Sequence, residues 1–226
     1  GEWTVPAAEG RLQAWFRRDR FGLRGTGMVV RLPESEARGG FAVARMGPDE
    51  ADRRLALRMT VDRMDVAEAR RFIPYKLQPP LYEWLTTTPM AGVINDGSVA
   101  YQGQFRVEPG DPGRRLEIVG NVVDGSIRFH PDWPGVEGFA GPVEVAGREV
   151  RALATRATSL GAELAGTRLH LTDNGTEAEV TLAAALDAGA ALDLVRGSPL
   201  SEPLAFVAPD WTAGGPLEVT GRLVLP

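Results

Sequence analysis

Two histidines, His130 and His170, are the residues of this sequence best suited to general acid–base chemistry, because imidazole often transfers protons near neutral pH. They do not share a spacing typical of metal ligands, and a zinc site would need further ligands. His130 falls on the polar phase of an alternating run, and His170 stands between Leu169 and Leu171. Both are therefore interpreted as solvated strand residues.

Other candidate motifs also favour structural roles. The Gly-rich run Gly22–Gly27 lies inside an alternating stretch and opens no helix, so it is not expected to bind phosphate. Asp49 and Glu50 adjoin a loop and are interpreted as solvated rather than as a catalytic carboxylate pair. Asn174-Gly175-Thr176 matches a glycosylation sequon, but Asn-Gly is typical of a hairpin turn. The sequence therefore predicts no enzyme, no cofactor and no metal site.

Composition narrows the possible functions further. The chain of 226 residues has a net charge of −5 and no cysteine, which argues against nucleic-acid binding and excludes disulfides and thiolate metal sites. No apolar run approaches the roughly 20 residues that cross a bilayer. Gly1–Val5 reads like the interior of a domain, and a strand-like run ends the sequence. We therefore expect an excised segment of a longer protein, with any anchor or targeting signal outside it.

Alternating apolar and polar residues dominate the sequence, a pattern typical of strands that bury one face. Asn95–Gly97, Asp111–Gly113, Asp124-Gly125 and Asn174-Gly175 are interpreted as tight hairpin turns, since Asn-Gly and Asp-Gly supply positive φ angles. The chain is therefore expected to be mainly β and antiparallel, without repeated βαβ units. The alternating runs are 55–61, 99–107, 116–122, 127–129, 178–182 and 217–225.

Three segments break the alternation and predict short helices. Residues 65–72 carry Ala and Glu at helical spacing, with Asp65 as the N-cap. Residues 79–87 begin with proline, which the first turn of a helix tolerates. Residues 188–195 are closed by Gly197 and Pro199. Between these segments, Trp133-Pro134 is expected to end one strand and begin the next.

Several short motifs occur in an order and spacing that together suggest a family. Arg71–Pro74 followed by Leu81–Leu85 resembles a helical crossing, and Gly97–Gly103 resembles the strand after it. Gly125–Phe129 with Asp132–Val136 resembles a strand followed by Trp-Pro. In this order they resemble the YhdP branch of the AsmA-like proteins of Gram-negative bacteria. The resemblance is best from about residue 70 to 226, and the first 65 residues fit as generic strands. Its remaining motifs are 161–167, 171–173, 198–200 and 221–223.

The resemblance implies a segment of a bridge-like lipid-transfer protein without catalytic residues. The fold it implies is a long, curved antiparallel sheet that forms an open apolar groove of repeating β-groove units with short helical crossings. The implied partners are phospholipid acyl chains. The implied location is the periplasm, with the parent protein anchored in the inner membrane and reaching the outer membrane through parts absent here.

On this interpretation the chain divides into four parts. Residues 1–64 would form β-groove strands and residues 65–90 a helical crossing. Residues 91–187 would form a β-groove repeat, and residues 188–226 a short helix and the start of the next β unit. Alternation also predicts the groove lining, which comprises Leu116, Ile118, Val122, Ile127, Phe129, Val143, Val145, Val150, Ala152, Val180, Leu182, Leu217, Val219, Leu223 and Leu225.

Two alternatives use the same alternation differently. In a closed β-sandwich, acting as an adhesion or scaffold module without lipid binding, the alternating residues would fill a core between two sheets. A carbohydrate-active β protein would need paired carboxylates, and no acidic pair stands out from the solvated faces. A trough would instead leave its apolar face open. An open sheet also has exposed end strands, so self-association of the excised segment through them is expected as a hazard.

Overall fold

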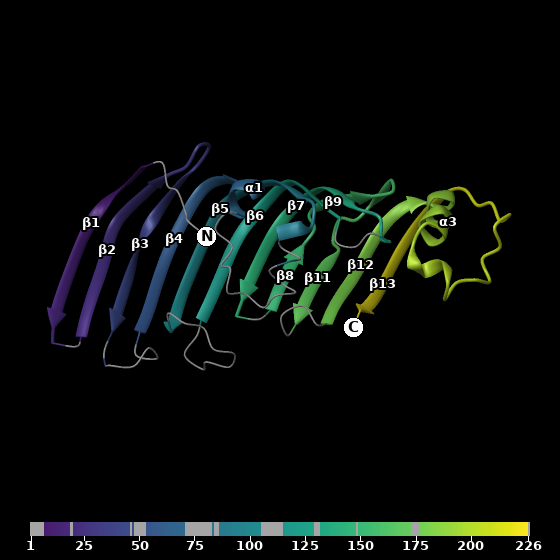
Figure 1. The fold of residues 1–226 in the computed structure, drawn as a ribbon. Coiled ribbons are helices and arrows are strands. Elements are labelled where there is room, and N and C mark those ends of the chain that lie inside the picture. The colour runs from purple at the N-terminus through teal and green to yellow at the C-terminus, as the bar shows by residue number, and fades with distance from the viewer. Residues whose placement is uncertain are drawn as a thin grey trace.

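The computed structural model describes residues 7–18, 20–45, 47, 53–70, 83, 86–104, 115–128, 132–147, 149–172 and 177–225. The strands within these ranges form one 13-stranded sheet in which every pairing is antiparallel. Figure 1 shows them side by side in a single layer, from β1 at one end to β13 at the other. The sheet is curved and is not closed into a barrel, so the predicted fold class is confirmed.

The sheet is an up-and-down meander. Strands β8 and β9 follow each other along β7, and β10 and β11 follow each other along β12, so each pair is one bent strand with a short break. The strands are β1 (Ala7–Arg17), β2 (Arg20–Arg31), β3 (Glu36–Arg45), β4 (Arg53–Asp65), β5 (Met90–Gln104), β6 (Arg115–Ile127), β7 (Val136–Ala146), β8 (Glu149–Leu153), β9 (Arg156–Ser159), β10 (Ala162–Glu163), β11 (Arg168–Thr172), β12 (Glu177–Asp187) and β13 (Pro216–Leu225).

Two predicted hairpin turns are β-bulges instead. Asp96 and Asp124 have φ angles of 52° and 50°, but they lie inside β5 and β6. The register of β5 against β6 shifts between Asn95 and Ser98, and that of β6 against β7 shifts between Val122 and Gly125. Positive φ suits a bulge as well as a tight turn, which explains the error. The other two predicted turns lie outside the described residues.

Two of the predicted helices are confirmed by their caps. Helix α1 (Val66–Ala69) begins after Asp65, whose carboxylate accepts a hydrogen bond from the Ala67 amide, and α3 (Ala188–Arg196) begins after Asp187, whose carboxylate accepts from Gly189. Both are N-caps of the expected chemistry. Most of the predicted helix at 79–87 lies outside the described residues, although residues 83, 86 and 87 are helical.

An arginine ties each helix to the chain that returns to the sheet. The Arg70 guanidinium donates to the carbonyl oxygens of Thr86 and Thr88, and Arg196 donates to those of Ala208 and Trp211. The crossing between β4 and β5 and the crossing between β12 and β13 are therefore each held by an arginine that bonds backbone carbonyl oxygens. No helix in the described part of the chain is both long and apolar enough to cross a membrane.

The sheet has almost no enclosed core. Among the described residues no large side chain is fully buried, and the buried apolar residues are Ala37, Met64, Ala154, Ala157 and Ala162. The accessible surface is 14714 Å², against roughly 10,000 Å² for a globular monomer of this mass. A closed sandwich would need a second, facing sheet. The described strands all belong to one sheet, so they do not form the sandwich that was the alternative.

Gly141 offers a test of the close approach between β7 and β8. Its φ is 150°, and a Cβ atom there would overlap the carbonyl oxygen of Leu153. We expect Gly141→Ala to lower the free energy of unfolding by about 3 kcal/mol through overpacking. Gly147 is the matched control, because it also has a positive φ but has open space around it. Gly147→Ala should cost about 1 kcal/mol, and equal losses in urea denaturation would contradict this account.

Candidate functional site

The strand register places one unbroken apolar row across nine strands. Residues directly opposite each other in antiparallel strands point to the same face. The row contains no polar side chain and, at about 4.8 Å per strand, is roughly 38 Å long. It runs through Met28, Gly39, Met59, Val99, Ile118, Val145, Val150, Leu171 and Ala178. We call the side of the sheet that carries this row the apolar face.

The register puts the sequence-predicted lining residues on this same face. Ile118, Val145 and Val150 belong to the row above, and Val143 and Ala152 are paired in the next row along β7 and β8. Val180 pairs with Leu223, Leu182 with Gly221, Ala184 with Val219 and Leu186 with Leu217, so these β12 and β13 positions share it as well. Leu116 and Val122 lie an even number of residues from Ile118 along β6, so they share its face. Phe129 lies outside the described residues, as does the side chain of Leu225.

Ile127 reaches the apolar face because of a bulge. Counting from Val122, an uninterrupted alternation would turn Ile127 to the opposite face. The bulge between Val122 and Gly125 adds one residue to β6 and reverses the phase. Ile127 then lies opposite Met90 and Val136, completing the face near the upper ends of β5 and β7.

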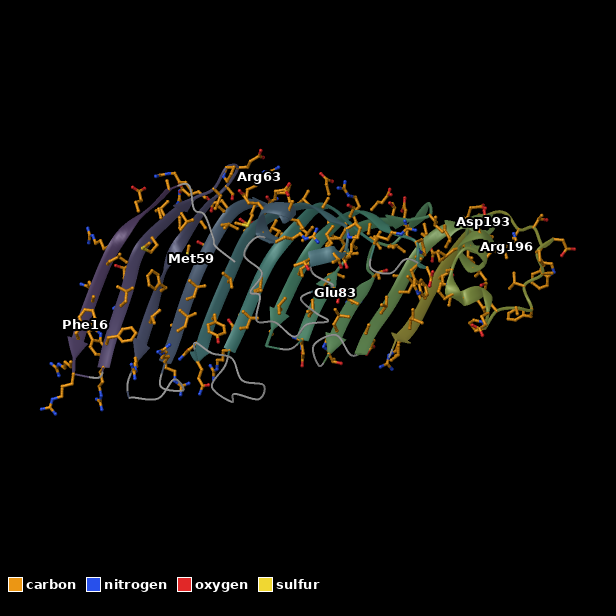
Figure 2. All side chains as sticks on the ribbon, viewed as in Figure 1. Phe16, Met59, Arg63, Glu83, Asp193 and Arg196 are labelled. Atoms are coloured by element: carbon orange, nitrogen blue, oxygen red, sulfur yellow. The ribbon has the colours of Figure 1, made fainter. Side chains whose placement is uncertain are left out.

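The lining predicted from the sequence contains no residue of β1–β5, although these strands also contribute to the apolar face. In β4, Leu55, Leu57, Met59 and Val61 are half-buried, whereas the residues between them are exposed. Phe41 lies opposite Leu57. The alternation that could have identified these positions is visible in the sequence, but the family resemblance was weakest there. Figure 2 shows side chains along the whole sheet, with Phe16 and Met59 labelled near its β1 end.

The opposite face is polar and carries ion pairs between strands. Arg222 of β13 bonds Glu179 of β12 at 2.7 Å, and Arg31 of β2 bonds Glu9 of β1 at 2.6 Å. Within β8, Arg151 bonds Glu149. His170 Nε2 lies 3.4 Å from Glu149, so this histidine lies on the polar face, and His130 lies outside the described residues. No group of three His, Asp or Glu side chains that could hold a metal occurs in the ranges described. In the described ranges the polar face thus presents charged side chains to water.

The Arg222–Glu179 pair predicts a pH effect. Its hydrogen bond and charge hold the pKa of Glu179 below the ordinary value of 4.5. Because the pKa is lowered in the folded state, the stability that this pair contributes is present above about pH 4.5 and is lost as the pH falls through the lowered pKa. We expect Arg222→Gln to raise the pKa of Glu179 towards 4.5, as measured by carboxyl NMR titration. Arg58→Gln, on β4, is the control; an unchanged pKa in the Arg222 variant would show that the pair does not form.

Comparison with known proteins identifies the family. The model of the family described as YhdP protein matches residues 2–226, so the similarity also includes the first 65 residues, which the sequence motifs had left as generic strands. No curated protein and no solved structure matches the chain significantly. The family comprises cell-envelope transport proteins for which no catalytic function is known. Because the match spans nearly the whole sequence, this chain belongs to the YhdP family.

Proposed function

We propose that this chain is a segment of a lipid-transfer conduit that shields phospholipid acyl chains on its apolar face between the inner and outer membranes. The observation that carries the proposal is the apolar row across nine strands, which no second layer of the described structure covers. Membership of a transport family supports it. The parent protein would lie in the periplasm, and its membrane contacts would belong to parts outside this chain.

The energetics favour an acyl chain as the occupant of the apolar face. Ile118 and Leu217 remain 40% and 37% exposed although they lie on that face. Each methylene group that moves from water onto such a surface contributes up to ~0.8 kcal/mol. A flexible chain could move along the row without passing a charged side chain, because the row contains none. The face would therefore hold a lipid without fixing it at one position.

The polar face also supports the proposal that lipid is bound on the apolar face alone. Its cross-strand pairs, such as Arg222–Glu179 and Arg31–Glu9, keep that side wetted, so the sheet needs cover on one side only. The lining proposed for lipid contact is the set predicted from the sequence, extended by Leu57, Met59 and Val99 of β4 and β5. The divisions at residues 64, 90 and 187 are proposed as the limits of the groove units and crossings.

A charge on the apolar face tests the proposal directly. We expect Val180→Asp to lower, several-fold, the phospholipid that co-purifies with the chain without detergent, because a carboxylate among acyl chains costs ~3 kcal/mol. Ile127→Asp should behave similarly, and both should impair lipid passage in the full-length protein. Extraction and mass spectrometry of lipid per mole of protein measure the first effect.

The matched control is the neighbouring residue on the other face. Thr181 follows Val180 in β12, is exposed and lies opposite Arg222, so Thr181→Asp should leave the lipid content unchanged. Circular dichroism of each variant checks that the strand still forms. Equal lipid content in the wild type, Val180→Asp and Ile127→Asp would count against the lining.

A further inference from the structure

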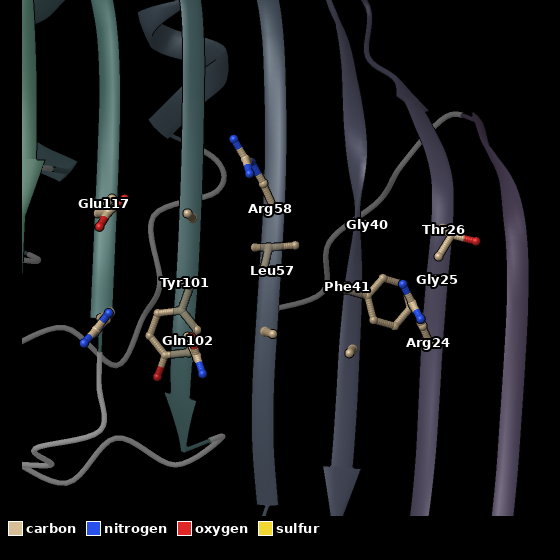
Figure 3. A pocket seen from close by; sticks show the side chains of 14 residues that line it. Arg24, Gly25, Thr26, Gly40, Phe41, Leu57, Arg58, Tyr101, Gln102 and Glu117 are labelled. Carbon is tan, nitrogen blue, oxygen red and sulfur yellow. The ribbon is translucent and has the colours of Figure 1, made fainter.

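The polar face carries a shallow depression rimmed by arginines. Its floor is made of residues with no side chain beyond Cβ, on β3, β4 and β5, and its rim includes Arg24 of β2 and Arg58 of β4 (Figure 3). Arg115 of β6 also belongs to the rim. Gln102 and Glu117 stand at its β5–β6 side. The floor residues are Gly40, Ala42, Ala56 and Ala100. We call this set of residues the arginine depression.

The register confirms that the depression is on the polar face. Arg24, Ala42, Ala56, Gln102 and Arg115 lie opposite one another in a single row. This row alternates with the positions of the apolar face along every strand from β2 to β6. A ligand of the depression would therefore be separated from any lipid by the thickness of the sheet.

The three arginines of the rim have no hydrogen-bond or ion-pair partner within the described residues. Several other arginines of the polar face are paired with carboxylates, as in the Arg222–Glu179 and Arg156–Asp124 pairs. No hydrogen bond or ion pair joins Arg24, Arg58 or Arg115 to another residue in the described ranges. Glu117 is the one acidic residue lining the depression, so its charge remains positive.

The spacing of the arginines defines the shape of a ligand. Arg24 and Arg115 are four strands apart, or roughly 19 Å at about 4.8 Å per strand. Arg58 lies two residues along β4 from Ala56, about 7 Å to one side of the row. A single phosphate is too small to reach all three guanidinium groups. An extended peptide of about six residues spans this distance, and its alternate side chains are about 7 Å apart.

We propose that the arginine depression binds an extended acidic segment of a partner protein. The Ala and Gly floor lets a peptide lie flat across β3–β5, and carboxylates at alternate positions meet Arg24, Arg58 and Arg115. Gln102 can bond a peptide amide or carbonyl. The negative charge of Glu117 repels the carboxylates of the peptide, so they lie on the side of the depression away from it. This surface goes beyond lipid transfer and does not depend on it, since the two ligands would occupy opposite faces.

The experiment uses fluorescence anisotropy of a labelled ten-residue peptide of alternating Glu and Ser with the 226-residue chain. We expect binding at low salt that weakens as salt is added. The variant Arg24→Gln/Arg58→Gln/Arg115→Gln should bind at least about tenfold more weakly, because three exposed charge pairs are removed. A peptide of alternating Gln and Ser should not bind to either protein.

The control variant also removes three positive charges from the polar face, but on strands outside the arginine depression. Arg151→Gln/Arg168→Gln/Arg222→Gln lies on β8, β11 and β13 and should keep the wild-type affinity for the Glu-Ser peptide. Equal weakening by both triple variants would show only general electrostatic attraction and would overturn the proposal. Binding to vesicles of phosphatidylglycerol and phosphatidylcholine without peptide binding would overturn it in favour of a membrane surface.

Discussion

The structure depends on one constraint: a single sheet whose apolar side chains have no second layer to pack against. In a two-layer domain each apolar face is buried by the other layer. Here the described strands form one layer, so the apolar residues are shielded mainly by their neighbours on the same face, and large side chains remain partly exposed. The free energy still available from covering that face is what makes the chain suited to an apolar ligand.

This constraint explains why the bulges matter. A strand that gains one residue turns all later side chains to the opposite face. Near Asp96 and Asp124 the register shifts, and the apolar phase beyond each shift still faces the same side. In β4 the two successive residues Asp62 and Arg63 are both exposed, so the alternation shifts by one residue there. Met64, the next residue, is buried again. The bulges thus bend long strands without interrupting the apolar face.

The alternation allowed the sheet, its antiparallel order and the identity of many face residues to be predicted, because side-chain direction in a strand follows the sequence directly. The cap Asp65 could be inferred for a similar reason, since capping is local. The bulges could not be distinguished from hairpins, because Asp with positive φ serves both. The arginine depression was not predictable, since Arg24, Arg58 and Arg115 come together only through the register of five strands.

The central claim is that the apolar face contacts lipid and the polar face does not. Adjacent residues in β11 separate the two sides: Leu171 belongs to the apolar row, and His170 lies on the polar face beside Glu149. A photo-reactive benzoylphenylalanine at each position, irradiated in envelope preparations, can be followed by mass spectrometry of the adducts. Phospholipid adducts from position 171 and none from position 170 are the predicted result. Adducts to protein alone at both positions would contradict it.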